Sequence, residues 1–201
     1  MRRWQRSLRD LGLLTGALML FAAPSPPARA QAPVPAENLV NALIGLDTAP
    51  DIDVAALRQQ VLERVKAKAD AAPLKRPPIA AQLLKLPQFS IEVQFDTDAP
   101  IIRPDSYRTL GRIADALQHP ALLGYGFLIV GHTESTGRRE INLTLSQRRA
   151  DAIRDVLVAT FKVSPKRLQA VGLGEEQLQD TAHPAAPVNQ RIQVVTVKAM
   201  P

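Results

Sequence analysis

An acid and a guanidinium in the stretch from Gly131 to Ile153 could together bind a zwitterion. Glu134 lies in a loop that Gly137 closes, and Arg149 lies on the helix predicted to follow. A carboxylate accepts hydrogen bonds from an ammonium group, and a planar guanidinium donates a fork of bonds to a carboxylate. The pair therefore predicts a receptor for the head group of an amino acid.

Helical spacing of apolar residues predicts a long helix from Glu140 to Phe161. Asn142 and Arg149 are seven residues apart and so share one face of that helix. A second interpretation stays open at this point. Arg149 could form an ordinary ion pair with Glu134 or another acid, and the loop could simply connect a strand to a helix.

The same stretch resembles the motif of the OmpA-like peptidoglycan-binding domain. In that family a strand ends in GHTD, a glycine-containing loop follows, and the next helix carries N, LS and RA at fixed offsets. The matching residues here are Gly131-His132-Thr133-Glu134, Gly137, Asn142, Leu145-Ser146 and Arg149-Ala150. Further family marks flank them in order: Phe95-Asp96-Thr97, Ile102, Pro104, Val171-Gly172-Leu173-Gly174-Glu175 and Asn189-Gln190-Arg191-Ile192. The resemblance covers roughly residues 88–198.

The resemblance implies non-covalent binding of meso-diaminopimelate in the peptide stem of the Gram-negative cell wall, without a metal or a cofactor. Glu134 would then meet the ligand ammonium and Arg149 its carboxylate. The residues implied around the pocket are Asp96, Thr97, Asn142 and Arg191. Two positions depart from the family pattern: Glu134 replaces the usual Asp and is one methylene longer, and Gln190 stands where the family often has an arginine.

The resemblance also implies the fold class, an α/β OmpA-like sandwich with helices packed on a mixed four-stranded sheet. Strands are expected around Ile91–Asp96, Phe127–Val130, Leu168–Val171 and Ile192–Val197. A helix capped by Asp105 or Ser106 should end at His119-Pro120. Gly172 and Gly174 are expected to turn the chain after the third strand.

Residues 1–30 have the pattern of a secretory signal peptide. Four arginines precede an apolar run from Leu11 to Ala23, and Ala28-Arg29-Ala30 has the small-x-small pattern of a cleavage site. As a helix this run spans about 20 Å, against about 30 Å of hydrocarbon in a bilayer, which favours a signal peptide over a membrane anchor. We expect no transmembrane span in the mature chain. The expected location is the periplasm.

Charge and cysteine content exclude other classes of protein. Residues 1–30 carry five of the 25 basic and one of the 19 acidic residues, which leaves a net charge of +2. The high isoelectric point is therefore no evidence for nucleic-acid binding. The chain has no cysteine, so it offers no thiol for lipidation, for a disulfide or for metal binding.

Residues 31–87 form an Ala/Pro-rich helical N-terminal region or linker before the domain at 88–198. Helices are predicted near Leu39–Leu46, from Val54 to Ala69 after a cap at Asp51 or Asp53, and near Ile79–Leu86. These helices are too few to enclose a core of their own. They could dock on the following domain, bind an envelope protein partner or serve as a spacer.

Together these features predict a periplasmic, non-enzymatic cell-wall-binding protein, associated with the wall and with the outer membrane. One alternative is a periplasmic adaptor whose wall site is weakened at Glu134 and whose partner binds residues 32–87. The other is a cell-wall hydrolase. A hydrolase needs a metal triad or an activated nucleophile, and His132-Thr133-Glu134 lacks the cysteines of the zinc signature that it partly matches.

Overall fold

A mixed sheet of four strands forms the centre of the fold. The computed structural model describes residues 35–45, 50–67 and 76–198, so the predicted signal peptide at 1–30 lies outside the described residues. The strands are β1 (Gln88–Ile91), β2 (Tyr125–His132), β3 (Leu168–Gly174) and β4 (Ile192–Lys198), in the order β1-β4-β2-β3. β2 pairs parallel with β3 and antiparallel with β4, which pairs antiparallel with β1. The predicted mixed four-stranded sheet is confirmed.

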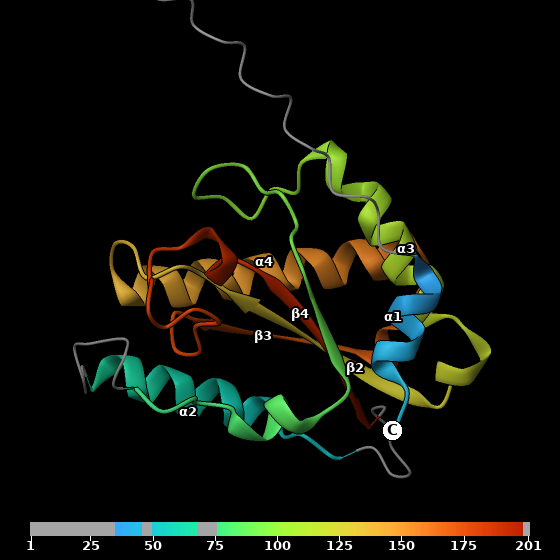
Figure 1. Cartoon of the computed structure of the whole chain (residues 1–201), viewed down its shortest axis with the longest axis horizontal. Helices are drawn as coiled ribbons and strands as arrows, with labels where there is room; N and C mark the ends of the chain where they lie inside the picture. Colours follow the sequence, from blue (N-terminus) through green and yellow to red (C-terminus); the bar gives the residue numbers. More distant parts are fainter. Residues whose placement is uncertain (1–34, 46–49, 68–75, 199–201) are drawn as a thin grey trace, which may run out of the picture. The chain divides into compact units, whose positions relative to one another are not determined.

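In the described part of the chain, four α-helices accompany the sheet (Figure 1): α1 (Ala36–Leu43), α2 (Val54–Lys66), α3 (Tyr107–Leu117) and α4 (Arg139–Ala159). Short 3-10 helices η2 (Ala81–Lys85), η3 (Pro104–Ser106), η4 (Pro120–Leu122), η5 (Pro165–Arg167) and η6 (Pro187–Asn189) lie between them. Helix α4 connects the parallel strands β2 and β3, as expected for a β-α-β unit. It therefore begins just after the loop that carries Glu134.

Strand alternation divides the apolar residues between two cores. On one face of the sheet Phe127 and Ile129 of β2 pack with α1, α3 and α4, and on the other face Leu128 and Val130 pack with α2. The second core also contains side chains from the N-terminal region, which pack with those of the sheet: Val54, Leu57, Val61, Ile79, Ala80 and Leu83. Figure 1 shows α4 and α2 on opposite sides of the strands.

The N-terminal helices dock on the domain. The apolar side of α1 is buried through Leu39, Val40 and Leu43, and that of α2 through a stripe of apolar residues that includes Leu57. Burying one such side chain contributes about 1.5–3 kcal/mol. Because these faces are used within the chain, a protein partner that contacts the described helices of residues 32–87 would have to bind their outer sides, where Leu62 and Leu84 are exposed.

Local predictions differ from the structure at several element ends. Asp53 caps α2, since its Oδ1 accepts a hydrogen bond from Ala56 N at 2.9 Å, but α1 ends at Leu43 and residues 81–85 form the 3-10 helix η2. The strand expected up to Asp96 ends at Ile91, and beyond it Phe95 forms only an isolated bridge to Ile102.

The predicted cap of α3 is wrong. Ser106 occupies the position before the helix, but no side chain caps the helix. Its Oγ instead accepts a hydrogen bond from Gln94 N at 2.9 Å. The hydroxyl is used by a segment 12 residues earlier in the chain, which local spacing cannot reveal.

The turn predicted at Gly172 is also wrong, because Gly172 lies within β3 and allows α4 to approach the strand. A Cβ at Gly172 would lie 2.2 Å from Gln147 N, and one at Gly131 would lie 2.3 Å from Ser146 O. Gly174 ends the strand with a φ of 53°, a conformation that glycine adopts readily. The prediction that Gly174 turns the chain after the third strand is confirmed.

We expect Gly172→Ala to lower the free energy of unfolding by at least about 2 kcal/mol, because the added methyl group meets helix backbone that cannot move aside. Urea denaturation measures this. Gly124→Ala is the matched control, since a Cβ there has no atom within 4 Å. Equal stability of the two variants would contradict the close-approach role of Gly172.

Candidate zwitterion-binding site

Arg149 lies on α4 as a buried cation. The residue is only 4% exposed, and its guanidinium carbon lies 4.9 Å from the centre of the Phe95 ring. Nε donates to the Ala99 carbonyl at 3.2 Å and Nη1 to Gln190 Oε1 at 3.1 Å. All three contacts are with neutral groups.

No carboxylate forms an ion pair with Arg149 among the described residues. The ion pair that the sequence left open as an alternative is therefore not formed there. Burial lowers the pKa of Arg149 below its ordinary value, while the charges of Asp98 and Glu134 act in the opposite direction. A guanidinium removed from water without an anionic partner is costly, so Arg149 is a candidate to bind an anion.

Glu134 lies two residues after His132, the last residue of β2, and is only partly buried. The backbone on both sides is anchored, since Thr133 N donates to Gly174 O at 3.0 Å and Ser135 N to Pro184 O at 2.9 Å. The Glu134 carboxylate accepts a 3.4 Å bond from Thr136 Oγ1 and forms no ion pair among the described residues. It is thus a carboxylate held on a fixed loop with acceptor capacity remaining.

Asn142 lies in the first turns of α4 and ties this loop together. Its Nδ2 lies 3.3 Å from the Glu134 carbonyl, 2.8 Å from the Thr136 carbonyl and 2.8 Å from Glu175 Oε2. An amide nitrogen has only two hydrogens, so these acceptors share them. Asn142 was predicted around the pocket, and the structure places it under the loop of Glu134.

The other predicted residues lie in two further loops. Asp96 and Thr97 are exposed in the loop that also supplies Ala99 to Arg149. Arg191 is buried and donates to the carbonyls of Gln177 at 3.1 Å and Asn189 at 3.4 Å. The structure thus joins Arg149 to the loop of Asp96, whereas the described hydrogen bonds of Arg191 go to backbone carbonyls and not to Glu134 or Arg149.

Four charged side chains to which sequence reasoning gave no role support the loop of Glu134. Glu175 and Glu176 follow β3, are buried, and receive hydrogen bonds from Arg76 and Arg139. The resemblance included Glu175 as a family mark but assigned it no role. Arg76 could not be found from spacing, since its partners lie 99 and 100 residues away.

The OmpA family model matches residues 94–192, the segment that contains the six predicted site residues. This part of the chain is an OmpA-family domain. The match includes β2, the loop of Glu134, α4 and β3.

Named relatives contain related OmpA-family sequence. Outer membrane porin F of Pseudomonas fluorescens is 37% identical over 116 residues, or 56% of this chain and 34% of the porin. Peptidoglycan-associated lipoprotein of Brucella melitensis is 42% identical over 84 residues, or 41% of this chain and 48% of the lipoprotein. The chain thus matches between about a third and about a half of the length of these relatives.

A solved structure with a similar arrangement is the peptidoglycan-associated lipoprotein from Burkholderia pseudomallei. It is 30% identical, with a TM-score of 0.43, and the comparison covers 62% of this chain and 98% of that chain. Within the part of this chain that the structure describes, no helix combines the length and apolar character needed to cross a membrane.

Gln190 takes on a specific contact in this OmpA-family domain. Its side-chain oxygen accepts the bond from Arg149 Nη1. An arginine at this position would present a second cation instead of an acceptor. The departure from the family pattern therefore changes the surroundings of Arg149, and does more than remove a surface charge.

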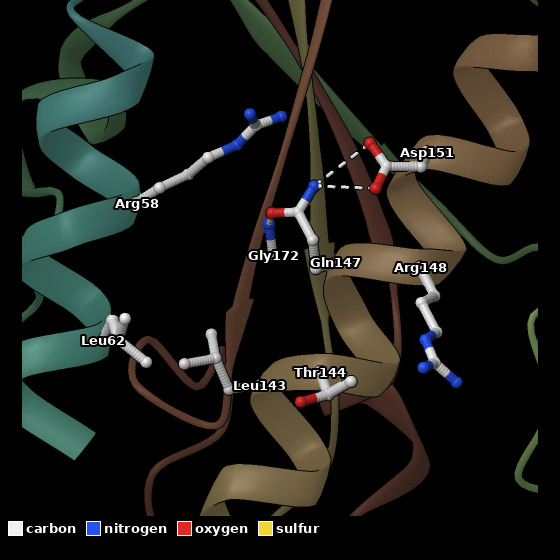
Figure 2. Close-up of a pocket in the computed structure, with 8 residues that line it drawn as sticks. All are labelled: Arg58, Leu62, Leu143, Thr144, Gln147, Arg148, Asp151 and Gly172. Carbon is white, nitrogen blue, oxygen red and sulfur yellow. Dashed lines mark hydrogen bonds between the residues drawn. The ribbon is translucent and has the colours of Figure 1, made fainter. Parts of the chain in front are cut away.

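Two cavities flank α4 without being lined by Glu134 or Arg149. One, of about 510 Å³, lies between α2 and α4 and is lined by Arg58, Leu62, Leu143, Thr144, Gln147, Arg148, Asp151 and Gly172. Figure 2 shows the Gln147 amide between Asp151 and Gly172. Its Nε2 donates to Asp151 Oδ1 at 3.1 Å, and its Oε1 accepts a hydrogen bond from Gly172 N at 2.8 Å. The other, of about 610 Å³, lies beside Asp98, Pro100 and the first half of α4.

His132 ends β2 inside the domain and is neutral. Its Nε2 lies 3.0 Å from Gln193 Oε1. Burial, helped by the charge of Arg191, lowers the pKa of His132 from 6.5 to about 3. Across the described ranges, no group of three or more metal-binding side chains lies close enough to hold an ion.

Protonation of His132 should couple the stability of the domain to pH. The unfolded chain binds this proton below about pH 6.5 and the folded chain only near pH 3, so stability from His132 is complete above pH 6.5 and is lost as the pH falls toward 3. Between pH 7 and pH 4.5 the wild type should lose about 2 kcal/mol more than His132→Gln. Urea unfolding at both pH values measures this. The exposed His119→Gln is the control, and identical pH slopes in all three proteins would contradict the assignment.

Proposed function

We propose that this chain is a non-enzymatic cell-envelope protein of the periplasm that binds peptidoglycan through the meso-diaminopimelate of the stem peptide. The supporting observation is Arg149, a buried guanidinium at the arginine position of an OmpA-family domain, which has only neutral partners among the described residues. A ligand carboxylate would supply the missing negative charge. Relatives named as peptidoglycan-associated lipoproteins point to the same polymer.

In this proposal Glu134 binds the ammonium of the same amino-acid head group. Its carboxylate has acceptor capacity remaining, and its charge already acts on Arg149. Asp96 and Thr97 lie in the loop that contacts Arg149 through Ala99, where they could contact the rest of the ligand. Asn142 and Arg191 would act through the loops that they fasten.

The proposed activity is non-covalent binding, in which no bond of the ligand is made or broken. His132, the histidine beside Glu134, is buried and neutral, with its ring engaged by Gln193, so it is poorly suited to act as a general base at neutral pH. The outer membrane is the proposed second association, because porin F and the lipoproteins belong to the envelope by name. A protein partner for residues 32–87 remains a prediction.

Arg149→Ala should lower binding to purified sacculi by more than tenfold, because losing a charged hydrogen-bond donor costs about 1.5–3 kcal/mol. Arg149→Lys should recover only part, since an ammonium cannot donate a planar fork. Co-sedimentation with sacculi measures both, and the thermal unfolding midpoint checks the fold. The exposed Arg108→Ala is the control. Wild-type binding by a folded Arg149→Ala would show that this residue is misassigned.

Glu134 allows a second, charge-specific test. Glu134→Gln should weaken binding of free meso-diaminopimelate by about tenfold or more, whereas Glu134→Asp should stay within about tenfold of wild type, because it keeps the charge and shortens the chain by one methylene. Calorimetry measures the three affinities, with L-lysine as a control ligand that lacks the second carboxylate. Equal affinities of the wild type, Glu134→Asp and Glu134→Gln would contradict the ammonium-binding role of Glu134. Equal binding of meso-diaminopimelate and L-lysine by the wild type would contradict it as well.

A further inference from the structure

Arg76 spans two consecutive buried carboxylates with one guanidinium. Its Nη2 donates to Glu175 Oε1 at 2.9 Å and its Nη1 to Glu176 Oε1 at 3.0 Å. The three side chains are 4%, 6% and 1% exposed. Arg76 precedes the OmpA-family match at 94–192, so the contact joins the N-terminal region to the domain.

The same two carboxylates hold the loop that carries Glu134. Glu175 accepts bonds from Ser135 Oγ at 3.0 Å and from Asn142 Nδ2 at 2.8 Å. Glu176 accepts two bonds of 2.7 Å from Arg139, the first residue of α4, which raise the pKa of Arg139. Both ends of the segment 135–139 therefore depend on Glu175 and Glu176.

Charge balance makes Arg76 necessary for this arrangement. Among the described ion pairs, Glu176 pairs with Arg76 and Arg139, and Glu175 pairs with Arg76 at 2.9 Å, while the charge of Arg139 also acts on Glu175. Two adjacent carboxylates repel each other, and a buried carboxylate without a cation is strongly unfavourable. Without Arg76, Glu175 would have to move toward water and release Ser135 and Asn142.

The segment around Arg76 is itself anchored. Ala80 N donates to Gln177 Oε1 at 3.2 Å, and Arg64 of α2 donates to the Pro77 carbonyl at 2.7 Å. Ile79, Ala80 and Leu83 are buried against the sheet. The guanidinium is thus delivered to Glu175 and Glu176 by a docked part of the chain.

We propose that Arg76 is a positioning residue for the ligand site: by neutralising Glu175 and Glu176 it holds the loop of Glu134 in its binding conformation. This inference rests on the proposed function of Glu134 and Arg149. It makes the segment before the OmpA-family match a working part of the binding site. A partner or ligand that displaced this segment would weaken binding at Glu134.

The test compares Arg76→Ala, Arg76→Lys and the exposed control Arg108→Ala in the full mature chain. Calorimetry with meso-diaminopimelate gives affinities, and hydrogen exchange gives the protection of amides in residues 134–142 relative to those of β2 and β4. Arg76→Ala should bind about tenfold more weakly or worse, with faster exchange confined to the loop. Arg76→Lys should be intermediate, since one ammonium cannot bridge both carboxylates as the fork does.

The outcomes separate this inference from the proposed function. Wild-type affinity of Arg76→Ala, with binding lost in Arg149→Ala, overturns the role of Arg76 alone. Faster exchange in every strand of Arg76→Ala, together with wild-type binding by Arg76→Lys, overturns it as well. If the wild type does not bind meso-diaminopimelate, the proposed function fails, and loop exchange in Arg76→Ala then decides: faster exchange supports the positioning role and unchanged exchange refutes it.

Discussion

The close packing of α4 against β2 and β3 is the constraint on which the site depends. Glycine at positions 131 and 172 lets helix backbone lie where any side chain would collide with it. Helix α4 carries Arg149, while the end of β2 leads into the loop of Glu134. The distance between the helix and the strands therefore sets the distance between the cation and the acid. A small change in this packing would move both groups of the site relative to each other.

Buried charges in this domain fall into two kinds with different physical consequences. Glu175 and Glu176 are balanced by Arg76 and Arg139, so their burial stabilises one arrangement of the loops. Arg149 has a ring face, a carbonyl and an amide oxygen, but no anion among the described residues. The paired charges of Glu175 and Glu176 hold the loops in place. The charge of Arg149 has no anionic partner among the described residues, and in the proposed function a ligand carboxylate supplies it.

The outer edge of the sheet is protected by side chains. Strand β3 is the last in the strand order, and an open strand edge invites pairing with another chain. Four side chains bond backbone groups of this strand: Arg154 at the Leu168 carbonyl, Arg58 at the Ala170 carbonyl, Gln147 at the Gly172 amide and Ser146 at the Gly174 amide. Three come from α4 and one from α2. The helices that cover the faces of the sheet thus also protect its edge.

The amino-acid sequence by itself determined the features that depend on local periodicity and on motif spacing. The long helix of Arg149, the buried strand before Glu134 and the mixed sheet followed from alternation, helical spacing and the family motif, because neighbouring residues largely decide which element forms. Element ends were less accurate, as at Ser106, where a hydrogen bond to a segment 12 residues earlier uses the hydroxyl that was expected to cap α3.

Only the tertiary structure decided how the N-terminal region and the supporting charges are used. The apolar stripe of α2 predicted a buried face but not the sheet face that it covers. Nothing in the spacing of Arg76 pointed to Glu175, 99 residues away, or of Arg149 to Gln190. Pairings of this kind arise when the folded chain removes charged groups from water and leaves them only the partners within reach. Sequence therefore predicted which groups would bind a ligand, and tertiary structure decided which other groups contact them.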